Sequence, residues 1–268
     1  MEHHDPSASA FAIVTGASSG IGFELAKQFA RNGFDLMIVA EDEDIFDAAS
    51  EIESLGAKVE PVQIDLAEED GVEEFYERIT SHGAPIDAIA INAGVGGGGA
   101  FLENDIEDEI NIINLNVIST VRLSKLVLRD MLVRNEGRVL YTSSIAADAP
   151  GPFEAVYAAS KAFVQSFAEA IRNELKDTGI TITSLQPGAT DTRFFERAGM
   201  EDTKVGAGKK DDPAVVAKEG FEALMAGKDH VVAGAMKNKM QSTMSKVVPE
   251  TTAAEMHRKQ AEPGSANQ

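Results

Sequence analysis

The sequence feature that most constrains the fold is the stretch at 15–22, which reads TGASSGIG. A short apolar run at 11–14 precedes it, and a helical pattern of apolar residues follows it as far as Gly33. A strand, a glycine-rich turn and a helix in this order form a cradle for phosphate groups. Glycines allow the tight turn, and the helix N-terminus presents free N–H groups. The spacing is G-x-x-x-G-x-G, which differs from the more familiar dinucleotide pattern G-x-G-x-x-G.

The same turn is compatible with two other interpretations. Residues 16–20 also fit G-x-S-x-G, the nucleophile elbow of α/β-hydrolases. An elbow needs an upstream sheet and an oxyanion loop, and only about ten residues precede this strand, which argues against it. The remaining alternative is a glycine-rich turn without a ligand. Residues further along the chain decide between these interpretations.

Composition restricts the chemistry that this chain can perform. Hydrophobic residues make up 43% of its 268 residues, enough for one large core. The chain has no cysteine, and its five histidines show no ligand spacing, so we expect no disulfide, no thiolate catalysis and no metal site. A formal net charge of −20 argues against nucleic acid and anionic membranes as partners. Because no membrane-spanning run and no signal-peptide pattern occurs, we expect a cytoplasmic protein.

Strand and helix patterns alternate through residues 10–234, which predicts a parallel sheet with helices on both faces. Pro61 lies in the third strand pattern and cannot donate a ladder hydrogen bond, so that strand belongs at an edge. The strand order 3-2-1-4-5-6 of a doubly wound sheet places the third strand there. We therefore predict one α/β domain of Rossmann type over 10–234, a disordered lead-in at 1–9 and a C-terminal helical extension at 235–268.

An acidic cluster, EDED at 41–44, follows the second predicted strand. A carboxylate at this point, about 20 residues after the glycines, is where a ribose 2′-hydroxyl is held. Acids there also suit the first turn of the next helix, and both roles can hold for different members. A carboxylate repels a 2′-phosphate, and neither the turn nor the cluster contains Arg or Lys. Glu41 or Asp42 therefore predicts that NAD(H) is preferred over NADP(H).

A long helical pattern covers 105–134 and is apolar on several faces. A helix of this kind is covered by more than its own sheet, and a second copy of the chain is a natural cover. We therefore expect a homodimer or a homotetramer. Asn116 lies inside this pattern, where a buried amide needs hydrogen-bond partners.

Tyr157 and Lys161 begin another helical pattern, and their spacing places them on one helix face. A free phenol has a pKa of about 10, too high for a base at neutral pH. A unit charge ~4 Å away at an effective dielectric of ~20 is worth about 4 kcal/mol, which would bring the pKa of Tyr157 towards neutrality. The pair thus predicts a general acid/base. The alternative is a Tyr and a Lys that lie at a surface.

Taken together, these motifs resemble the short-chain dehydrogenase/reductase family, and the resemblance covers about residues 11–195. It implies a Rossmann-type fold and hydride transfer between a nicotinamide cofactor and an alcohol or ketone. The resemblance rests on the order and spacing of TGASSGIG at 15–22, Asn92-Ala-Gly94, Asn116, Ser144, Tyr157-x-x-x-Lys161 and Pro187-Gly188.

The resemblance implies four catalytic residues, Asn116, Ser144, Tyr157 and Lys161. Tyr157 would exchange a proton with the substrate oxygen, and Ser144 would hydrogen-bond the same oxygen. Lys161 would lower the pKa of Tyr157 and hold the nicotinamide ribose. Asn116 would anchor, through its carbonyl and a water, a proton relay that leads to Lys161.

The resemblance also implies a cofactor site built from several loops. Asp65 and Leu66 would contact the adenine, and the loop at 187–192 would grip the carboxamide and the diphosphate. With the acidic cluster added, the expected cofactor-binding residues are Gly16, Ser18, Ser19, Gly20, Ile21, Gly22, Glu41, Asp42, Asp65, Leu66, Asn92, Ala93, Gly94, Tyr157, Lys161, Pro187, Gly188, Thr190 and Thr192.

The chain departs from the family pattern at two places. Many NADP-dependent relatives carry Arg where this chain has the acidic cluster. The family often ends soon after a seventh strand, predicted here at 230–234, whereas more than thirty residues follow. Methionines at 236, 240 and 244, with Val247, recur at helical spacing. They predict an amphipathic helix at 236–248 that covers the substrate side or a neighbouring subunit.

The predicted substrate pocket is lined by Ile145, Phe153, Val95 and the segment 194–200, which flank the catalytic residues. Such a lining favours a small apolar alcohol or ketone. Two alternatives use the same scaffold. An epimerase would need the same Tyr and Lys, and a dinucleotide-sensing protein without turnover usually lacks one of them, whereas both are present here.

Overall fold

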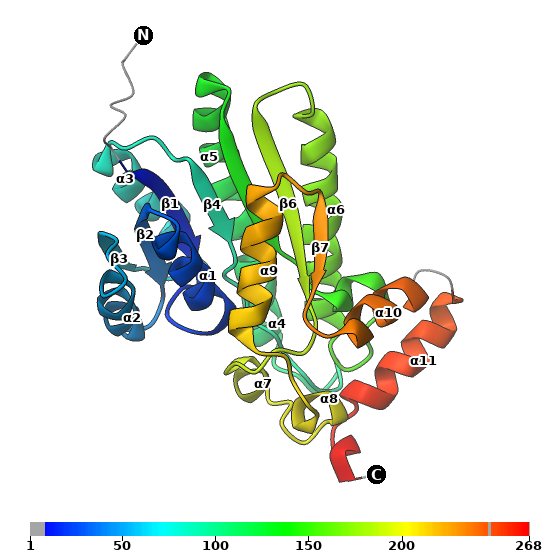
Figure 1. The fold of residues 1–268 in the computed structure, drawn as a ribbon. Helices are drawn as coiled ribbons and strands as arrows, with labels where there is room; N and C mark the ends of the chain where they lie inside the picture. Colours follow the sequence, from blue (N-terminus) through cyan, green and yellow to red (C-terminus); the bar gives the residue numbers. More distant parts are fainter. Residues whose placement is uncertain (1–8, 246–247, 268) are drawn as a thin grey trace.

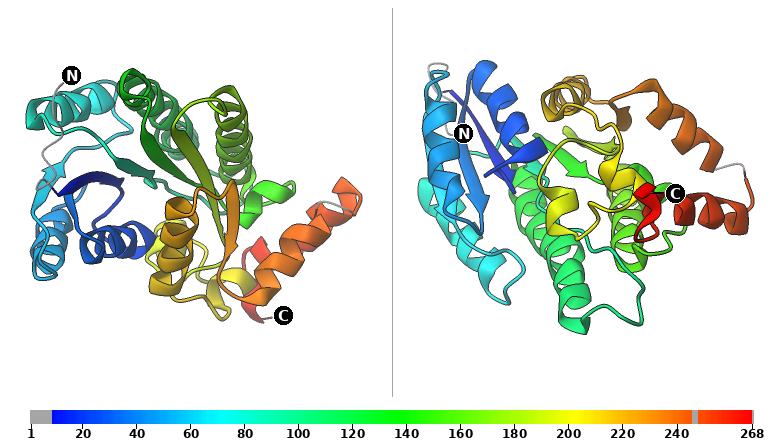
Figure 2. Two further views of the ribbon diagram at one scale, coloured as in Figure 1. Left: turned by 45° about the horizontal axis from the view of Figure 1, so that its top comes forward. Right: turned by 90° about the horizontal axis from the view of Figure 1, so that it is seen from below.

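A parallel β-sheet lies at the centre of the molecule, with helices packed on both faces (Figures 1 and 2). The computed structural model describes residues 9–245 and 248–267, so the predicted disordered lead-in lies, except for residue 9, outside the described residues. Within these ranges the sheet has seven strands in the order β3-β2-β1-β4-β5-β6-β7, which confirms the predicted doubly wound α/β fold. The strands are β1 (Ala10–Thr15), β2 (Phe34–Ala40), β3 (Val59–Gln63), β4 (Ala88–Ile91), β5 (Gly137–Thr142), β6 (Ile180–Pro187) and β7 (His230–Ala233).

The position of a strand in the sheet agrees with the residues that the strand contains. Met37, Ile38 and Val39 of β2 are fully buried, as expected of an inner strand covered by helices on each side. Pro61 of β3 stands opposite Ile38, and β3 is an edge strand. The edge position predicted from this proline is therefore confirmed.

Helices cover the two faces of the sheet in separate groups. Helices α1, α2 and α9 pack on one face, and α3, α5 and α6 pack on the other (Figure 1). In the described part of the chain, no helix is both long and apolar enough to cross a membrane. The helices are α1 (Gly20–Arg31), α2 (Asp44–Glu53), α3 (Gly71–His82), α4 (Ile106–Ile113), α5 (Thr120–Arg134), α6 (Ala155–Glu174), α7 (Phe194–Arg197), α8 (Lys204–Ala207), α9 (Pro213–Met225), α10 (Met236–Ser245) and α11 (Glu250–Ala261).

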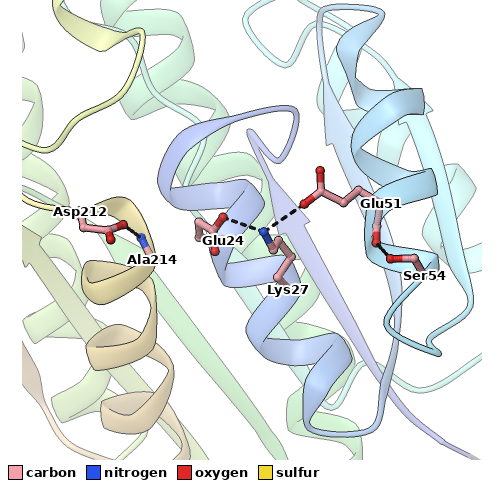
Figure 3. A network of polar contacts seen from close by, with 6 residues as sticks. All are labelled: Glu24, Lys27, Glu51, Ser54, Asp212 and Ala214. Atoms are coloured by element: carbon pink, nitrogen blue, oxygen red, sulfur yellow. Dashed lines mark hydrogen bonds and ion pairs between the residues drawn. The ribbon is translucent and has the colours of Figure 1, made fainter.

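Polar contacts fix helix α1, which follows the glycine-rich turn. Lys27 of α1 contacts Glu24 at 2.9 Å and Glu51 of α2 at 3.1 Å (Figure 3). On the other side of α1, Asp212 caps α9 by accepting a hydrogen bond from the Ala214 N–H at 2.8 Å. The contact between Lys27 and Glu51 thereby ties α1 to α2.

The predicted helix at 105–134 contains a π-helical turn. Helix α4 leads into this turn at Asn114–Ser119, and α5 follows it without a break. The Thr120 hydroxyl donates to the backbone carbonyl of Asn116 at 2.9 Å within the turn. Single π-turns inside α-helices occur mostly at functional sites, and this one contains the predicted catalytic Asn116.

The C-terminal extension forms two helices, α10 and α11, beyond the β7 edge of the sheet (Figure 2). The predicted amphipathic helix begins at Met236, as α10 does, but Val247 lies outside the described residues. Met236 and Met240 are 71% and 61% exposed, so the chain by itself does not bury the methionine stripe. Helix α11 was not predicted from the sequence.

Candidate functional site

A cavity of about 730 Å³ opens where the strands end at their carboxyl termini. This is the position at which open α/β sheets bind their ligands. Every residue that the resemblance assigned to the cofactor lines this cavity, and so does Ser144. Asn116 alone of the predicted site residues does not line the cavity. It lies behind Gly94, where an added side chain would come within 3.0 Å of its Oδ1.

The glycine-rich turn has the backbone shape that a phosphate cradle needs. Gly16 has a φ of 65°, and a Cβ at Gly22 would lie 2.1 Å from the Gly16 carbonyl oxygen. No side chain caps α1 at Ser19, and its first turn holds no acid, so this end of the helix suits an anion. In the described residues the Ser18 hydroxyl donates to Asp42 at 3.1 Å and has no histidine partner, which argues against a nucleophile elbow.

Asp42 occupies the most informative position of the acidic cluster. Its Oδ2 accepts hydrogen bonds from Ser18 and from Arg197 of α7, both at 3.1 Å. Its Oδ1 is buried and has no hydrogen-bond partner in the part of the chain that the structure describes. A buried carboxylate oxygen of this kind requires a donor, and it belongs to a residue that lines the cavity.

Two arginines that the sequence analysis did not connect with the acidic cluster lie beside it. Arg197 contacts Asp42, and Arg193 contacts Asp44 at 2.8 Å. Both arginines line the cavity. The turn and the cluster themselves contain no Arg or Lys, as the sequence shows, but the fold brings these two cations to the cluster from another segment.

Asn92 joins three strands at the floor of the cavity. Its Nδ2 donates to the Thr15 carbonyl at 3.1 Å, and its Oδ1 accepts from the Thr142 hydroxyl at 3.0 Å. The Thr15 hydroxyl in turn accepts from the backbone N–H groups of Asn92 and Ala93 at 3.0 and 2.9 Å. These bonds fix the ends of β1, β4 and β5 relative to one another.

Asn116 holds the backbone that follows β4. Its Oδ1 accepts from the Val95 N–H, and its Nδ2 donates to the Val95 carbonyl, both at 2.9 Å. The same Nδ2 donates to the Ser160 hydroxyl at 2.9 Å, which ties this backbone to α6. Lys161 Nζ donates to the Thr142 carbonyl at 3.1 Å and lies against Gly94 with Asn116. Asn116 therefore supports the region around Lys161 from behind.

Burial is the main influence on the pKa values of Tyr157 and Lys161. It raises the pKa of Tyr157, a hydrogen bond with Ser144 opposes this rise, and the negative charge of Glu154 adds to it. Burial also lowers the pKa of Lys161 to about 8. The predicted net fall of the Tyr157 pKa towards neutrality is wrong, because burial raises this pKa. The Lys161 ammonium lies 5.9 Å from the centre of the phenol ring, and burial is the largest influence on the Tyr157 pKa.

Only some of the residues predicted to line a substrate pocket lie at the cavity. Ile145, Val95 and Phe194 line the cavity, and the rings of Phe194 and Tyr157 lie 5.1 Å apart. Phe153 does not line it, because its ring lies under the Arg258 guanidinium at 5.0 Å and packs on a separate buried cluster. Met200 is fully buried in that same cluster and is also absent from the lining.

The C-terminal extension completes the wall of the cavity. Met240 and Met244 of α10 and Met256 and His257 of α11 line it. His257 Nε2 lies 2.8 Å from Glu154 Oε2, which links α11 to the residue that precedes α6. Sequence reasoning missed the contribution of α11 because its apolar residues show no clear helical period.

Comparison with known proteins identifies the family. The family model described as short chain dehydrogenase matches residues 10–202. The chain belongs to the short-chain dehydrogenase family. It therefore has the Rossmann-type fold of that family, as the resemblance implied.

Several members of the short-chain dehydrogenase family illustrate the extent of the similarity. A short-chain type dehydrogenase/reductase of Sinorhizobium fredii is 36% identical over 218 residues, which cover 80% of this chain and 83% of that protein. The oxidoreductase EphD of Mycobacterium tuberculosis is 35% identical over 190 residues, 70% of this chain, but the match spans only 32% of its length. A short-chain dehydrogenase of Sphingobium yanoikuyae, solved with NADPH, superposes with a TM-score of 0.77 at 28% identity, covering 83% of this chain and 87% of that one.

Proposed function

We propose that this chain is an NAD(H)-dependent oxidoreductase that interconverts an alcohol and a ketone, with Tyr157 as the general acid/base. The observation that carries the proposal is that Tyr157, Ser144 and Lys161 line the same cavity as the glycine-rich turn. A proton donor, a hydrogen-bond donor for an oxyanion and a cradle for a dinucleotide are thus available to one bound substrate.

The residues present fit a nicotinamide dinucleotide. The uncapped N-terminus of α1 suits the diphosphate of the cofactor. Asp42 Oδ1, which has no hydrogen-bond partner among the described residues, could accept a hydrogen bond from a ribose hydroxyl. Lys161 would hold the ribose at the nicotinamide end. When bound, the cofactor supplies or accepts the hydride.

The choice between NAD(H) and NADP(H) depends on Asp42 and Arg197. A 2′-hydroxyl can donate to Asp42, whereas a 2′-phosphate meets the negative charge of that carboxylate. Arg197 lies 3.1 Å from Asp42 and offsets part of this repulsion. We therefore propose a moderate preference for NAD(H), roughly ten- to a hundredfold, in place of exclusive use.

Proton transfer would proceed from a phenol that is protonated at neutral pH. Because burial raises the pKa of Tyr157, the residue is a proton donor during reduction of a carbonyl. Ser144 would donate a hydrogen bond to the same substrate oxygen and stabilise the charge that develops there. The Lys161 ammonium would stabilise the phenolate that remains after the proton has left.

The cavity wall supports an apolar substrate. Ile145, Val95 and Phe194 contribute apolar surface beside Tyr157, and methionines of α10 and α11 extend it. Methionine side chains adapt to the shape of a ligand, so this wall suits a range of small apolar alcohols or ketones.

We also propose that the chain forms a homodimer or a homotetramer. Ile106 and Ile110 of α4 are 59% and 41% exposed, and Phe163 of α6 is 38% exposed. Exposed apolar side chains on neighbouring helices are typical of a subunit interface. Sedimentation equilibrium measures the mass, and a monomer at micromolar concentration would contradict this part of the proposal.

The proposed activity is tested with a panel of alcohols and ketones. Absorbance of the reduced nicotinamide is followed with each of the two cofactors. We expect turnover of neutral apolar compounds, with the higher kcat/KM for NAD(H). Absence of turnover with every compound, or better turnover of charged compounds than of neutral ones, would contradict the proposal.

A further inference from the structure

The C-terminal extension contacts the loop after β6 through one buried amide. Asn238 lies in the first turn of α10 and is 1% exposed, whereas Lys237 and Lys239 on either side are exposed. A buried amide in an otherwise polar helix requires hydrogen-bond partners. The hydrogen-bond partners of Asn238 show which parts of the chain α10 contacts.

Asn238 donates two hydrogen bonds from Nδ2. One goes to Asp211 Oδ2 at 2.6 Å and the other to the Ala233 carbonyl at 2.9 Å. The bond to Asp211 is charge-assisted, and bonds of this class are stronger than neutral ones. Asn238 therefore fastens α10 both to Asp211 and to the end of β7.

Asp211 holds the loop at 187–192 through its backbone. Its N–H donates to the Ala189 carbonyl, and its carbonyl accepts from the Asp191 N–H, both at 2.8 Å. Together these bonds form a short parallel bridge with Thr190. The carboxylate that Asn238 binds thus belongs to the residue that fixes this loop.

Asn238 also packs directly on the loop at Gly188. A Cβ added at Gly188 would lie 2.4 Å from both Cγ and Nδ2 of Asn238, so the amide lies against the bare glycine backbone. Gly234 is required for a similar reason, because a Cβ there would lie 2.3 Å from Asp211 Oδ2. The loop is therefore held by Asp211 through hydrogen bonds and by Asn238 through contact.

We propose that Asn238 is a positioning residue for hydride transfer, acting through Asp211 and Gly188 on the loop that orients the nicotinamide. This inference rests on the proposed function and extends it, because it assigns the C-terminal extension a role in positioning the cofactor. A misplacement of about 1 Å at a reacting group can cost roughly a hundredfold in rate. A contact such as that of Asn238 with the loop can therefore affect the rate of hydride transfer without touching the reacting groups.

The first test measures the loop without turnover. Hydrogen exchange of the backbone amides is compared between the wild type and Asn238→Ala, with no cofactor added. We expect faster exchange at the Asp191 amide, whose acceptor is the Asp211 carbonyl. The matched control is Lys239→Ala, which alters an exposed side chain of the same helix and leaves this exchange unchanged. Equal exchange in Asn238→Ala and in the wild type would overturn the proposal.

The second test measures the geometry of transfer with the best ketone of the panel. NADH deuterated on one face of C4 reports which hydrogen is transferred. We expect Asn238→Ala to lower kcat by roughly ten- to a hundredfold and to transfer hydrogen from both faces, with a smaller change in KM. A variant that merely loosens the extension would keep its stereospecificity, and that result would overturn the proposal.

If Asn238→Ala fails to fold, a double variant that exchanges the side chains of positions 211 and 238 still tests the proposal. Asp211→Asn combined with Asn238→Asp restores a donor and an acceptor between the two positions but not the bond to the Ala233 carbonyl. We expect partial recovery of kcat and of stereospecificity relative to Asn238→Asp alone, and no recovery would count against the proposal. If the wild type transfers no hydride, the proposed function is wrong, while exchange at Asp191 still decides whether Asn238 holds the loop.

Discussion

Glu154 and His257 are 103 positions apart in the sequence, yet Glu154 Oε2 and His257 Nε2 lie 2.8 Å from each other. Glu154 directly precedes α6, the helix that carries Tyr157, and His257 belongs to α11. The next residue of α11, Arg258, stacks on Phe153, whose φ of 66° is rare for a side chain of that size. Helix α11 therefore holds the residues that lead into α6.

The charge of Glu154 should affect the pH dependence of the proposed alcohol oxidation. Burial is the main cause of the raised pKa of Tyr157, and the negative charge of Glu154 raises it further. Glu154→Gln removes that charge and keeps the shape of the side chain, so the pKa of Tyr157 falls. Oxidation needs the phenolate, and its kcat should therefore rise at lower pH than in the wild type. The control is Glu169→Gln, an exposed carboxamide substitution on the same helix. Identical pH profiles for all three proteins would contradict this prediction.

Replacing Tyr157 by Phe separates catalysis from binding. Tyr157→Phe removes the proton donor and keeps the ring that packs on Phe194, so turnover is lost while NADH affinity, measured by fluorescence titration, is nearly unchanged. Ser144→Ala removes one hydrogen-bond donor for the oxyanion and should lower kcat by roughly 10²–10³-fold. Near wild-type turnover by Tyr157→Phe would show that the site has been misassigned.

We predict that burial of the Lys161 ammonium destabilises the fold. Its pKa falls from 10.5 to about 8 on folding, so burial of the ammonium costs about 3 kcal/mol below pH 8. The cost fades as the pH rises from 8 to 10.5, because the unfolded chain then binds more protons than the folded one. Lys161→Met should therefore be inactive but more stable than the wild type at pH 7, by up to about 3 kcal/mol, with a smaller gain at pH 10. Urea unfolding at both pH values measures this, and an equal gain at both would contradict it.

Asp42 and Arg197 should shift cofactor preference in opposite directions. Asp42→Asn removes the charge that repels a 2′-phosphate and leaves Arg197 without its ion pair, so kcat/KM for NADPH should rise about tenfold or more relative to NADH. Arg197→Gln removes the nearby cation and should lower kcat/KM for NADPH. Arg193→Gln is the matched control, because its partner is Asp44. A ratio of the two efficiencies that stays constant in all variants would show that another group sets the preference.

Local patterns were sufficient to predict the sheet and most of the residues that line the glycine-rich end of the cavity. Pro61 indicated an edge strand, and the glycines at 15–22 indicated a phosphate cradle, because both depend on the backbone of the residue itself. The spacing of Tyr157 and Lys161 placed them on one helix face for the same reason. These predictions needed only the geometry of one strand, turn or helix.

Contacts between distant segments could not be predicted in this way. Arg197 reaches Asp42 across 155 positions, and no sequence period connects them. Helix α11 was missed because its contacts are a histidine, an arginine and single apolar residues in place of an apolar stripe. The direction in which the pKa of Tyr157 shifts depends on burial, and burial depends on the whole fold. The spacing of Tyr157 and Lys161 along the helix indicated only that a positive charge is nearby.

The ion pairs from Arg193 and Arg197 to the acidic cluster connect the segment around α7 with the segment that follows β2. Phe194 lies between these arginines in the sequence and packs on Tyr157 in the substrate region. A substitution at Asp42 that changes cofactor use therefore also removes a tether of the substrate wall. If the proposed function holds, we therefore expect substitutions at Asp42 to change cofactor use and substrate discrimination together. An NADP-dependent variant should then need a new partner for Arg197 in the same step.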